Sequence, residues 1–563
     1  MQVFFKILLG TLLIFNYSLT AKYKAPVRAK NGMVVSASDI ASLVGVEILR
    51  QGGNAIDAAV ATGFALAVTY PQAGNIGGGG FMVIHLEDGT NTTIDYREKA
   101  PAAAFRDMFL DENGNYDSNK STEGGLSSGV PGSVAGMLYA LNKYGTMTIK
   151  DVIQPAIELA AGGFPIDYRF ANALNRFSDE FRKHESTKRI FAKSDENFIE
   201  GDLFIQEDLA KTLIRIKKNG KDGFYKGETA KLIAEQSKRD GGFITEKDLE
   251  NYSPVEREPI IGNYRGNTIV SMGPPSSGGI ALTEALNSLE NFSFEKKDWA
   301  SSEYIHTVVE VLKYVYADRA KHLGDEDFYP VPKRWLTSKE RGKEIASKVG
   351  EKAKPSNEIS HGTPPPEESE QTTHYSVADS YGNAVSVTTT LNSTFGNKIV
   401  VKGAGFLLNN EMDDFSAKPG TPNQYGLLGG EANAVEPNKR MLSAMTPTIV
   451  LNSDNKPYLI IGAPGGSTII TTVMQIILNV IDFDMDISEA ISSPRFHHQW
   501  KPDRIDYERY GMTKDVKENL LRRGHHMGKL RSLGRAEGIL IDYKEGIFWG
   551  ASDPRGYGEA EGY

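Results

Sequence analysis

The chain has 563 residues, of which 40% are hydrophobic and 24% are charged, and its formal net charge is −9. This balance is that of a globular protein with a large core, so disordered and collagen-like chains are excluded. The negative charge and the lack of a dense Lys/Arg tract argue against a nucleic-acid partner. The chain has no cysteine, which excludes disulfides, thiol nucleophiles and cysteine-bound metals.

The first residues have the order of a signal peptide. Lys6 precedes the apolar run from Ile7 to Phe15, and no acidic residue occurs before Asp39. The run is well short of the roughly 20 apolar residues that a membrane span needs. We therefore expect a leader over residues 1–21 that is removed, rather than a membrane anchor. An exported protein without disulfides fits a bacterial periplasmic or secreted location.

Helical periodicity dominates the first two-thirds of the chain. Apolar residues at helical spacing follow Ser38-Asp39 and stop at Gly52-Gly53, and an alanine-rich helix is predicted over residues 54–70. Amphipathic helices are also predicted over residues 209–218, 229–239 and 302–322. The four glycines of residues 77–80 lack the Lys and Ser/Thr of a phosphate loop, so close backbone packing is the better interpretation.

The composition changes sharply at residues 355–371, where Ile359 is the only aliphatic residue among prolines and glutamates. Such a stretch is expected to bury no face and to be mobile. Directly after it, apolar and polar residues alternate on both sides of a turn at residues 379–383, which predicts a β-hairpin that begins at or near Thr372. A strand that starts abruptly behind a polar arm is a candidate for a new N-terminus.

The C-terminal part is predicted to contain a second hairpin, over residues 448–451 and 458–461, and a helix over residues 467–481. The motifs HExxH, GxSxG and Walker A are absent as functional arrangements. His497 and His498 are adjacent, so their side chains point in different directions, and no Asp or Glu lies at a useful spacing for a metal. These residues therefore do not predict a metal site.

An N-terminal threonine can be a nucleophile without help from another side chain. Its hydroxyl needs a base, and the free α-amine of the same residue can serve as one. An α-amine titrates near about 7.7 to 8, so part of it is neutral at physiological pH. Within an intact chain the same nitrogen is an amide, so chain cleavage would create the base.

The segment QTTHYSV at residues 371–377 resembles the processing site of γ-glutamyltransferases, which belong to the N-terminal-nucleophile hydrolase superfamily. The resemblance covers nearly the whole mature chain. It continues, in the family's order, through DYREKAP and GNIGGGGF in the first part and through TTTLNSTFG, LLNNEMDDFSAKPG, PNKRMLSAMTPT, GAPGGS, PRFHHQW and ASDPR in the second.

The resemblance implies roles for four residues in catalysis. Thr372 would be the nucleophile, first in cleavage of the Gln371–Thr372 bond and then toward substrate. Thr390 would position it, although the residue alone would be read as an ordinary strand threonine. Gly465 and Gly466, at a strand-to-helix junction, would form the oxyanion hole with their backbone N–H groups.

A γ-glutamyl group carries an α-carboxylate and an α-ammonium, and the resemblance implies residues for both. Arg97 and Ser443 would bind the carboxylate, while Asn392, Glu411 and Asp414 would hold the ammonium. Taken alone, Arg97-Glu98 and Asp413-Asp414 would be ordinary surface charges. The chain departs from the family's serine pair at Ala444, which has no hydrogen-bonding side chain. A lid over residues 419–434 would shield the pocket with Tyr425.

The resemblance implies an α+β fold, a four-layer αββα sandwich, made of a large part (22–371) and a small part (372–563) that stay together as one globule. The implied reaction transfers the γ-glutamyl group of glutathione and related amides to water, amino acids or peptides, and it needs no metal or organic cofactor. Alternatives within the fold are a glutaryl-type acylase, which retention of Arg97 with Asp414 disfavours, and a poly-γ-glutamate depolymerase. Two further alternatives are a non-catalytic periplasmic binding protein and, more weakly, a descendant that has lost processing.

Overall fold

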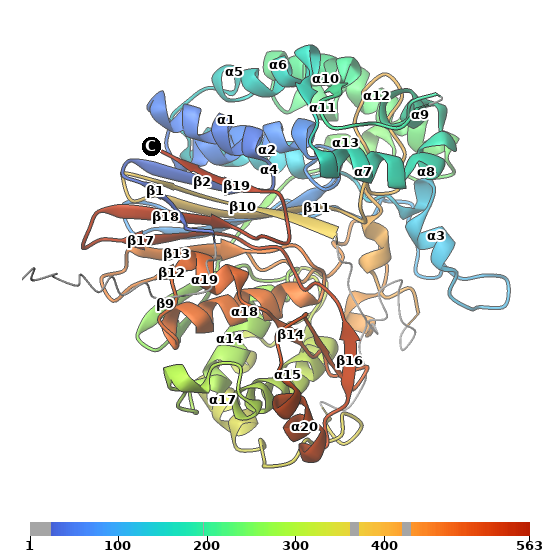
Figure 1. Ribbon diagram of the computed structural model, residues 1–563. Helices are drawn as coiled ribbons and strands as arrows, with labels where there is room; N and C mark the ends of the chain where they lie inside the picture. The colour runs from blue at the N-terminus through green and yellow to red at the C-terminus, as the bar shows by residue number, and fades with distance from the viewer. Residues whose placement is uncertain (1–23, 195, 361–370, 419–429) are drawn as a thin grey trace, which may run out of the picture.

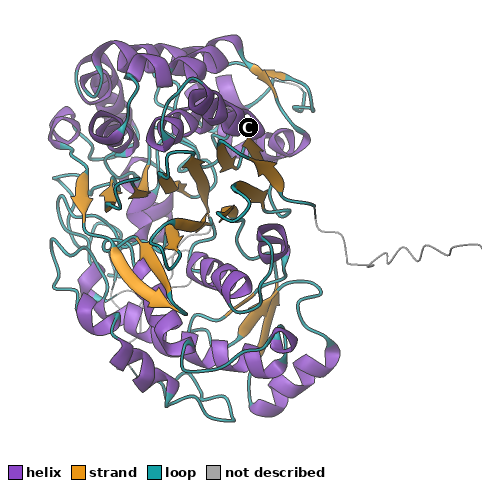
Figure 2. Ribbon diagram, turned by 90° about the vertical axis from the view of Figure 1, so that its left-hand side faces the viewer, coloured by secondary structure: helices purple, strands orange, loops and turns teal. Residues whose placement is uncertain are grey.

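Two seven-stranded sheets lie face to face between two layers of helices (Figure 1). The computed structural model describes residues 24–194, 196–360, 371–418 and 430–563, and it describes Gln371 and Thr372 by their backbone only. The expected leader and Tyr425 lie outside these residues. Figure 2 shows the strands between the upper and lower helices in a view turned by 90°. The predicted αββα sandwich is confirmed.

Every strand pairing within these two sheets is antiparallel. The first sheet, in spatial order, contains β19 (Glu559–Gly562), β2 (Gly32–Ser36), β10 (Gln371–Asp379), β11 (Ala384–Asn392), β3 (Gly79–His85), β4 (Asn91–Asp95) and β7 (Val255–Arg257). The second contains β1 (Val27–Ala29), β18 (Ile547–Ser552), β17 (Glu537–Asp542), β13 (Pro457–Gly462), β12 (Thr448–Leu451), β9 (Asn267–Ser271) and β8 (Ile260–Tyr264). Short strands outside the sandwich are β5 (Phe164–Pro165), β6 (Leu203–Phe204), β14 (Phe496–His497), β15 (Ile505–Tyr507) and β16 (Met527–Leu530).

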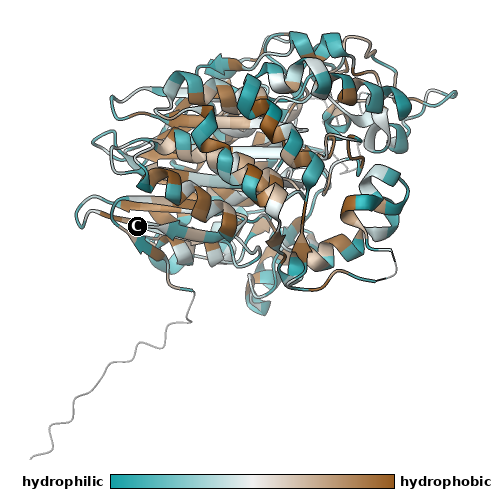
Figure 3. Ribbon diagram, turned by 90° about the horizontal axis from the view of Figure 1, so that it is seen from above, coloured by the Kyte–Doolittle hydropathy of each residue, from teal (hydrophilic) through white to brown (hydrophobic). Residues whose placement is uncertain are grey.

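Each sheet is covered by its own helices (Figure 1). The layer over the first sheet comprises α1 (Asp39–Arg50), α2 (Ala55–Thr69), α4 (Ser133–Tyr144), α5 (Ile149–Val152), α6 (Gln154–Gly162), α7 (Tyr168–Arg176), α8 (Ser178–Arg182), α9 (Glu185–Phe191), α10 (Glu207–Asn219), α11 (Asp222–Tyr225), α12 (Gly227–Arg239) and α13 (Glu246–Asn251), with α3 (Ser118–Thr122) at one side. The other layer comprises α14 (Gly278–Leu289), α15 (Ser302–His322), α16 (Lys333–Leu336), α17 (Lys339–Ala346), α18 (Thr468–Ile481), α19 (Ile487–Ser492) and α20 (Lys514–Arg523). Figure 3 shows many strongly hydrophobic positions along the strands between these layers. Among the described helices, none is of a length and apolarity that would span a bilayer.

Helix α2 supports the centre of the first sheet. Its N-terminus is closed by a capping box, in which Asn54 and Asp57 each satisfy a backbone N–H of the other. All of its residues are buried, and its alanines let the helix lie close to β10 and β11. At Gly63 a Cβ would stand 2.7 Å from the Tyr375 hydroxyl. The helix and β10 therefore pack with no room for a side chain at this point.

The glycines of residues 77–80 bring β3 against β11 by close backbone packing, as predicted. A Cβ at Gly78 would collide with the carbonyl of Thr390, and one at Gly80 with the carbonyl of Thr388. The predicted helices and both predicted hairpins are also confirmed.

The prediction for residues 355–371 was wrong at the start of that stretch. Ser356 and Ile359 are each 2% exposed. The Ser356 backbone donates to Asp503 at 2.8 Å, and its carbonyl accepts from the Trp500 indole at 2.7 Å. A single aliphatic residue with two hydrogen bonds is enough to anchor this part, while residues 361–370 lie outside the described chain.

A polar seam joins the two sheets behind the start of β10. His374 is fully buried, and its two ring nitrogens hydrogen-bond the hydroxyls of Thr388 and Ser376, each at 3.0 Å. Ser376 in turn donates across to the carbonyl of Glu537 on β17 at 3.0 Å. The imidazole therefore orients β10 against the second sheet.

Gly462 is expected to tolerate no side chain, because a Cβ there would stand 2.5 Å from the His374 ring. The ring is held by two hydrogen bonds and has little freedom to move. Gly462→Ala should lower the free energy of unfolding by about 1–3 kcal/mol, measured in urea. The control is Gly162→Ala, because nothing lies within 4 Å of a Cβ at that helical position. Equal stability of the two variants would contradict the packing described here.

The pH dependence of stability should carry a contribution from His374. Burial lowers the pKa of His374 to about 3, whereas in the unfolded chain it titrates near about 6.5. The unfolded state therefore binds the extra proton, so this contribution is complete above pH 6.5 and is lost as the pH falls toward 3. His374→Asn should flatten the fall in unfolding free energy between pH 6.5 and 4 by up to about 1.4 kcal/mol per pH unit. His526→Asn, at an exposed position, should retain the wild-type slope.

Candidate active site

The site is organised around the first residues of β10. Thr372 pairs with Thr390 of β11, and the register is irregular between Gln371 and Thr372. The Thr390 hydroxyl accepts the backbone N–H of Asn392 at 2.8 Å. Asn392 has a φ of 72°, a left-handed conformation in which asparagine is enriched. The chain therefore turns away from the sheet directly beside the backbone of Thr372.

Arg97 lies at the centre of a buried charge cluster, which we define as Arg97, Glu98, Glu411 and Asp414. Its two terminal nitrogens form ion pairs with Glu411 and Asp414, and Glu98 lies 3.7 Å from one of them. The guanidinium also donates to the carbonyls of Met441 and Leu442, each at 3.3 Å. All four side chains are at most 6% exposed. The expectation that Arg97-Glu98 and Asp413-Asp414, taken alone, are surface charges was wrong, since Asp413 is buried as well.

Burial and charge pairing act in opposite directions on this cluster. Burial acts to lower the pKa of Arg97, but Glu411 and Asp414 raise it above its ordinary value. Burial raises the pKa of Glu411 and Asp414, against the effect of Arg97, and it raises the pKa of Glu98 to about 7. The Arg97 guanidinium is therefore the neighbouring group that opposes the effect of burial on the Glu411 and Asp414 carboxyl groups.

Short turns place these side chains after regular elements. Arg97 follows β4, and its backbone N–H donates to Asp95 at 2.9 Å. Glu411 and Asp414 belong to a 3₁₀ turn, η3 (Glu411–Asp414). Asn409 holds the start of that turn, because its amide accepts from the Glu411 N–H at 3.1 Å and donates to the carbonyl of Gly77 at 2.9 Å. The glycine run and the acidic turn are thus parts of one structure.

Asn392 and Ser443 are each linked to the charge cluster through a residue beside it. The Asn392 amide donates to the carbonyl of Asn410, the residue before Glu411, at 2.8 Å. Ser443 follows Leu442, and its hydroxyl accepts the backbone N–H of Met445 at 3.1 Å. Ala444 is buried in the apolar core beside the second sheet. Its methyl group therefore packs into apolar surroundings.

Gly465 and Gly466 connect β13 to α18 with φ values of 140° and 58°. The Thr468 hydroxyl donates to the Gly465 carbonyl at 2.7 Å, and a Cβ at Gly465 would stand 2.5 Å from that hydroxyl. Both glycines precede the first turn of α18, where backbone N–H groups lack intrahelical partners. The turn can therefore present donors to a developing oxyanion.

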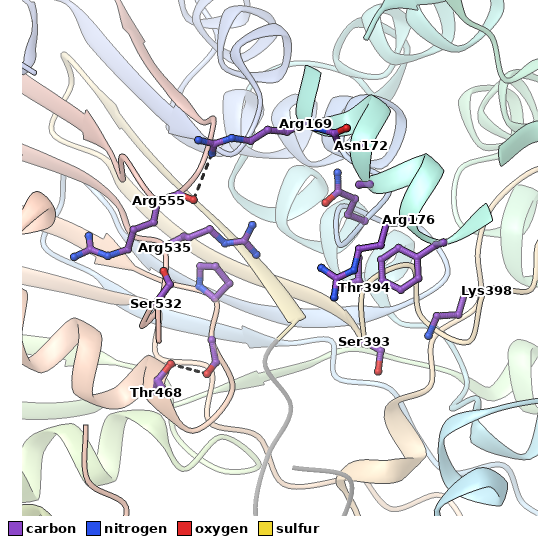
Figure 4. Close-up of a pocket in the computed structure, with 16 residues that line it drawn as sticks. Arg169, Asn172, Arg176, Ser393, Thr394, Lys398, Thr468, Ser532, Arg535 and Arg555 are labelled. Atoms are coloured by element: carbon purple, nitrogen blue, oxygen red, sulfur yellow. Dashed lines mark hydrogen bonds between the residues drawn. The ribbon is translucent and has the colours of Figure 1, made fainter. Parts of the chain in front are cut away.

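A cavity of about 660 Å³ adjoins this glycine turn (Figure 4). Its walls come from α7, from the loop after β11, from the glycine turn, and from the segments that flank β17 and β18. It is lined by Gln72, Arg169, Asn172, Ala173, Arg176, Phe177, Ser393, Thr394, Lys398, Pro464, Gly465, Thr468, Ser532, Gly534, Arg535 and Arg555. We call it the arginine cavity.

The histidines that could suggest a metal are engaged with other protein groups. His497 bonds Thr471 at 2.9 Å and His498 bonds Asp503 at 3.2 Å, so the two rings point to different partners, as predicted. Within the described chain, one group of three potential ligands lies within 4.8 Å: His306, Glu310 and His525. The two imidazoles in it bond each other at 2.8 Å, and Glu310 pairs with Lys313 at 2.8 Å.

A family model described as gamma-glutamyltranspeptidase matches residues 41–563. The chain belongs to this family.

Relatives and solved structures agree with that assignment. The chain is 52% identical to the glutathione hydrolase proenzyme of Escherichia coli (strain K12) over 542 residues, or 96% of this chain and 93% of that protein. It resembles the crystal structure of Helicobacter pylori gamma-glutamyltranspeptidase with a TM-score of 0.57 and 45% identity, over 61% of this chain and 96% of that one. It also resembles a cephalosporin acylase from Bacillus halodurans with a TM-score of 0.85 and 26% identity, over 99% of both chains. The chain is thus a γ-glutamyltransferase of the N-terminal-nucleophile type.

Sequence reasoning missed two charged residues of this γ-glutamyltransferase. Glu98 was not assigned a role, although it is fully buried beside Arg97 and follows it directly in the sequence. Arg319 of α15 is buried, donates to the Ser277 hydroxyl at 2.8 Å and acts electrostatically on Asp414. Glu98 could have been suggested by its position directly after Arg97, but nothing in the sequence links Arg319 to Asp414.

Removal of the Arg97 guanidinium should destabilise the protein strongly, because two buried carboxylates would lose their countercharge. Arg97→Met should lower the free energy of unfolding by about 3–5 kcal/mol, measured by chemical denaturation. The matched control is Arg106→Met. Arg106 pairs with Glu431, and their side chains are 45% and 68% exposed, respectively. That substitution should cost less than about 1 kcal/mol. Similar costs at both sites would show that the buried pairs carry little of the stability.

Proposed function

We propose that this γ-glutamyltransferase cleaves its own chain between Gln371 and Thr372 and then uses the α-amine of Thr372 as the base for its hydroxyl. The observation that carries the proposal is the position of the bond. It lies at the first residues of β10, a strand that pairs with β11 from Gln371 onward and with β2 from Tyr375 onward. Cleavage there frees an amine without removing a strand from the sheet.

In the acylation step the Thr372 hydroxyl oxygen attacks the γ-carbonyl of glutathione or a related amide. The α-amine takes the hydroxyl proton and passes it to the leaving amine, and an ester between threonine and the γ-glutamyl group remains. Water or the amine of an amino acid or peptide then attacks that ester. The same α-amine accepts the proton of the incoming nucleophile and passes it to the departing threonine oxygen, so that the ester bond breaks and the threonine hydroxyl is restored.

Three further residues are proposed to assist this chemistry. Gly465 and Gly466 supply backbone N–H donors to the oxyanion, which their place before α18 supports. Thr390 positions the nucleophile, since its backbone pairs directly with that of Thr372. Positioning of this kind contributes to catalysis by holding the reacting groups in one geometry.

The charge cluster is proposed to bind the α-amino acid end of the γ-glutamyl group. The α-carboxylate would take the Arg97 guanidinium with help from Ser443, and the α-ammonium would take Glu411, Asp414 and Asn392. Glu411 and Asp414 each have one buried carboxylate oxygen without a hydrogen-bond partner among the described residues. The α-ammonium of a γ-glutamyl group can donate hydrogen bonds to these oxygens, and its α-carboxylate can accept hydrogen bonds from Arg97.

The large part (22–371) and the small part (372–563) are proposed to remain associated after the cut. The first sheet takes β2, β3, β4 and β7 from the large part and β10, β11 and β19 from the small one. The second sheet is mixed in the same way. Separation would break backbone pairings in both sheets. Export through the expected leader, to a periplasmic or secreted location, is also part of this proposal.

The alternatives differ in the group they recognise. A glutaryl-type acylase needs no pocket for an α-ammonium, whereas the pairing of Arg97 with Glu411 and Asp414 provides both charges. A poly-γ-glutamate depolymerase would share the same γ-glutamyl head. A binding protein without chemistry would need neither chain cleavage nor a nucleophile.

Thr372→Ala should abolish both cleavage and activity. Expressed without residues 1–21, the wild type should give two fragments by mass spectrometry, the second starting at Thr372, and should release amine from a γ-glutamyl anilide. The variant should stay intact and lose at least about 10³-fold in activity, the scale typical of removing a nucleophile.

The neighbouring threonine provides a matched control. Thr373→Val changes a buried side chain to one of the same shape, and it should leave both cleavage and activity in place. A folded wild-type chain that is intact and inactive would contradict the proposal and favour a binding protein.

A further inference from the structure

The arginine cavity carries an excess of positive charge. Five of its lining side chains are cationic, namely Arg169, Arg176, Lys398, Arg535 and Arg555, and no carboxylate side chain lines it. Arg555 is neutralised by ion pairs with Glu508 and Asp553. The other four form no ion pair with any carboxylate of the described chain. A cavity with such walls attracts anions.

Neutral groups hold two of these guanidinium groups in place. Arg169 donates to the carbonyl of Gly556 at 2.5 Å and lies 3.0 Å from the centre of the Tyr557 ring. Arg535 donates to the Tyr70 hydroxyl at 3.2 Å. Since neither contact removes the positive charge, both groups are oriented in advance and still able to pair with an anion.

Two of the arginines face each other across the cavity. Figure 4 shows the guanidinium groups of Arg535 and Arg176 extending toward one another, from the segment before β17 and from the end of α7. Arg176 belongs to the large part of the chain and Arg535 to the small part. An anion between them would bridge the two parts.

The cavity meets the reaction centre on the side that the γ-glutamyl head does not occupy. Gly465 lines it, and Ser393 and Thr394 follow β11 just beyond Thr390, the partner of Thr372. Arg97, Glu411 and Asp414 are not among its lining residues. If the head binds at the charge cluster and the amide at Thr372, the part of the substrate beyond the amide reaches this cavity.

We propose that Arg535 and Arg176, with Arg169, bind a carboxylate in the leaving group of the donor and thereby select donors with an anionic end beyond the scissile amide. Glutathione has such a group, because its leaving dipeptide ends in a glycine carboxylate. A γ-linked glutamate chain also presents a carboxylate beyond its amide. This inference rests on the proposed function, since it needs a γ-glutamyl amide bound at Thr372.

The test compares donors that differ only beyond the amide. The kcat/KM is measured for glutathione, for glutathione with an amidated C-terminus, for a γ-linked glutamate trimer and for a γ-glutamyl anilide. The wild type should prefer glutathione over its amide by about 10- to 100-fold, the range expected for one or two charge-assisted contacts. In Arg535→Gln and Arg176→Gln, the ratio of kcat/KM for glutathione to that for the anilide should fall by a similar factor.

A matched control separates specificity from folding. Arg239→Gln removes an exposed arginine of α12, whose side chain donates to Gln236, and it should keep the wild-type ratio. A structural defect would lower kcat/KM for every donor alike, and that result would overturn the inference, as would an unchanged ratio.

Two other outcomes have distinct meanings. If the variants lost kcat/KM only for the γ-linked glutamate trimer, the assignment to the dipeptide carboxylate would be overturned. The cavity would then be a binding site for γ-linked glutamate chains. A wild type that hydrolyses no γ-glutamyl donor, the anilide included, would refute the proposed function rather than the assignment of the cavity alone.

Discussion

The constraint on which this structure depends is the placement of β10 between two neighbouring strands of the first sheet. The strand bonds β2 on one side and β11 on the other, while α2 packs on one face and the second sheet on the other. A strand held on every side retains its position when the chain is cut before it, because the pairing does not depend on the preceding peptide bond. An N-terminal residue of this kind is both free at its amine and rigid at its backbone, which is what a nucleophile that supplies its own base requires.

Burial determines which groups the charge cluster can bind. An arginine with two exposed carboxylates would exchange partners with water at little cost, but here the four side chains are almost completely covered. Each charge therefore needs a partner, and a substrate head that carries both signs can provide one for each. The arginine cavity differs, because its positive charges are oriented by carbonyl, hydroxyl and aromatic groups rather than by carboxylates. The two sites thus hold their positive charges by different means, which suits the opposite ends of the donor that we propose for them.

The sequence predicted much of this arrangement through local signals. The capped helix that begins at Asn54 and the hairpin that starts beside Thr372 follow from residue types and spacing, and both are present. The glycine run was rightly interpreted as close packing. Local reasoning failed for Arg97-Glu98, where adjacent charges are usually exposed, and for Ile359, where one aliphatic residue in a polar stretch is buried. In both cases the deciding partners lie more than a hundred residues away in the sequence.

By itself, the sequence determined the family, and it predicted the residue types of the chemistry and the point at which a new N-terminus would arise, because these depend on short motifs and on local propensity. Only the tertiary structure decided which charges are buried and which residues line the arginine cavity. Arg319 acts on Asp414, and Arg176 faces Arg535, because the fold brings together segments that are far apart along the chain. The reason is physical: the strength of an electrostatic interaction depends on distance and on exclusion of water, and both are properties of the folded chain.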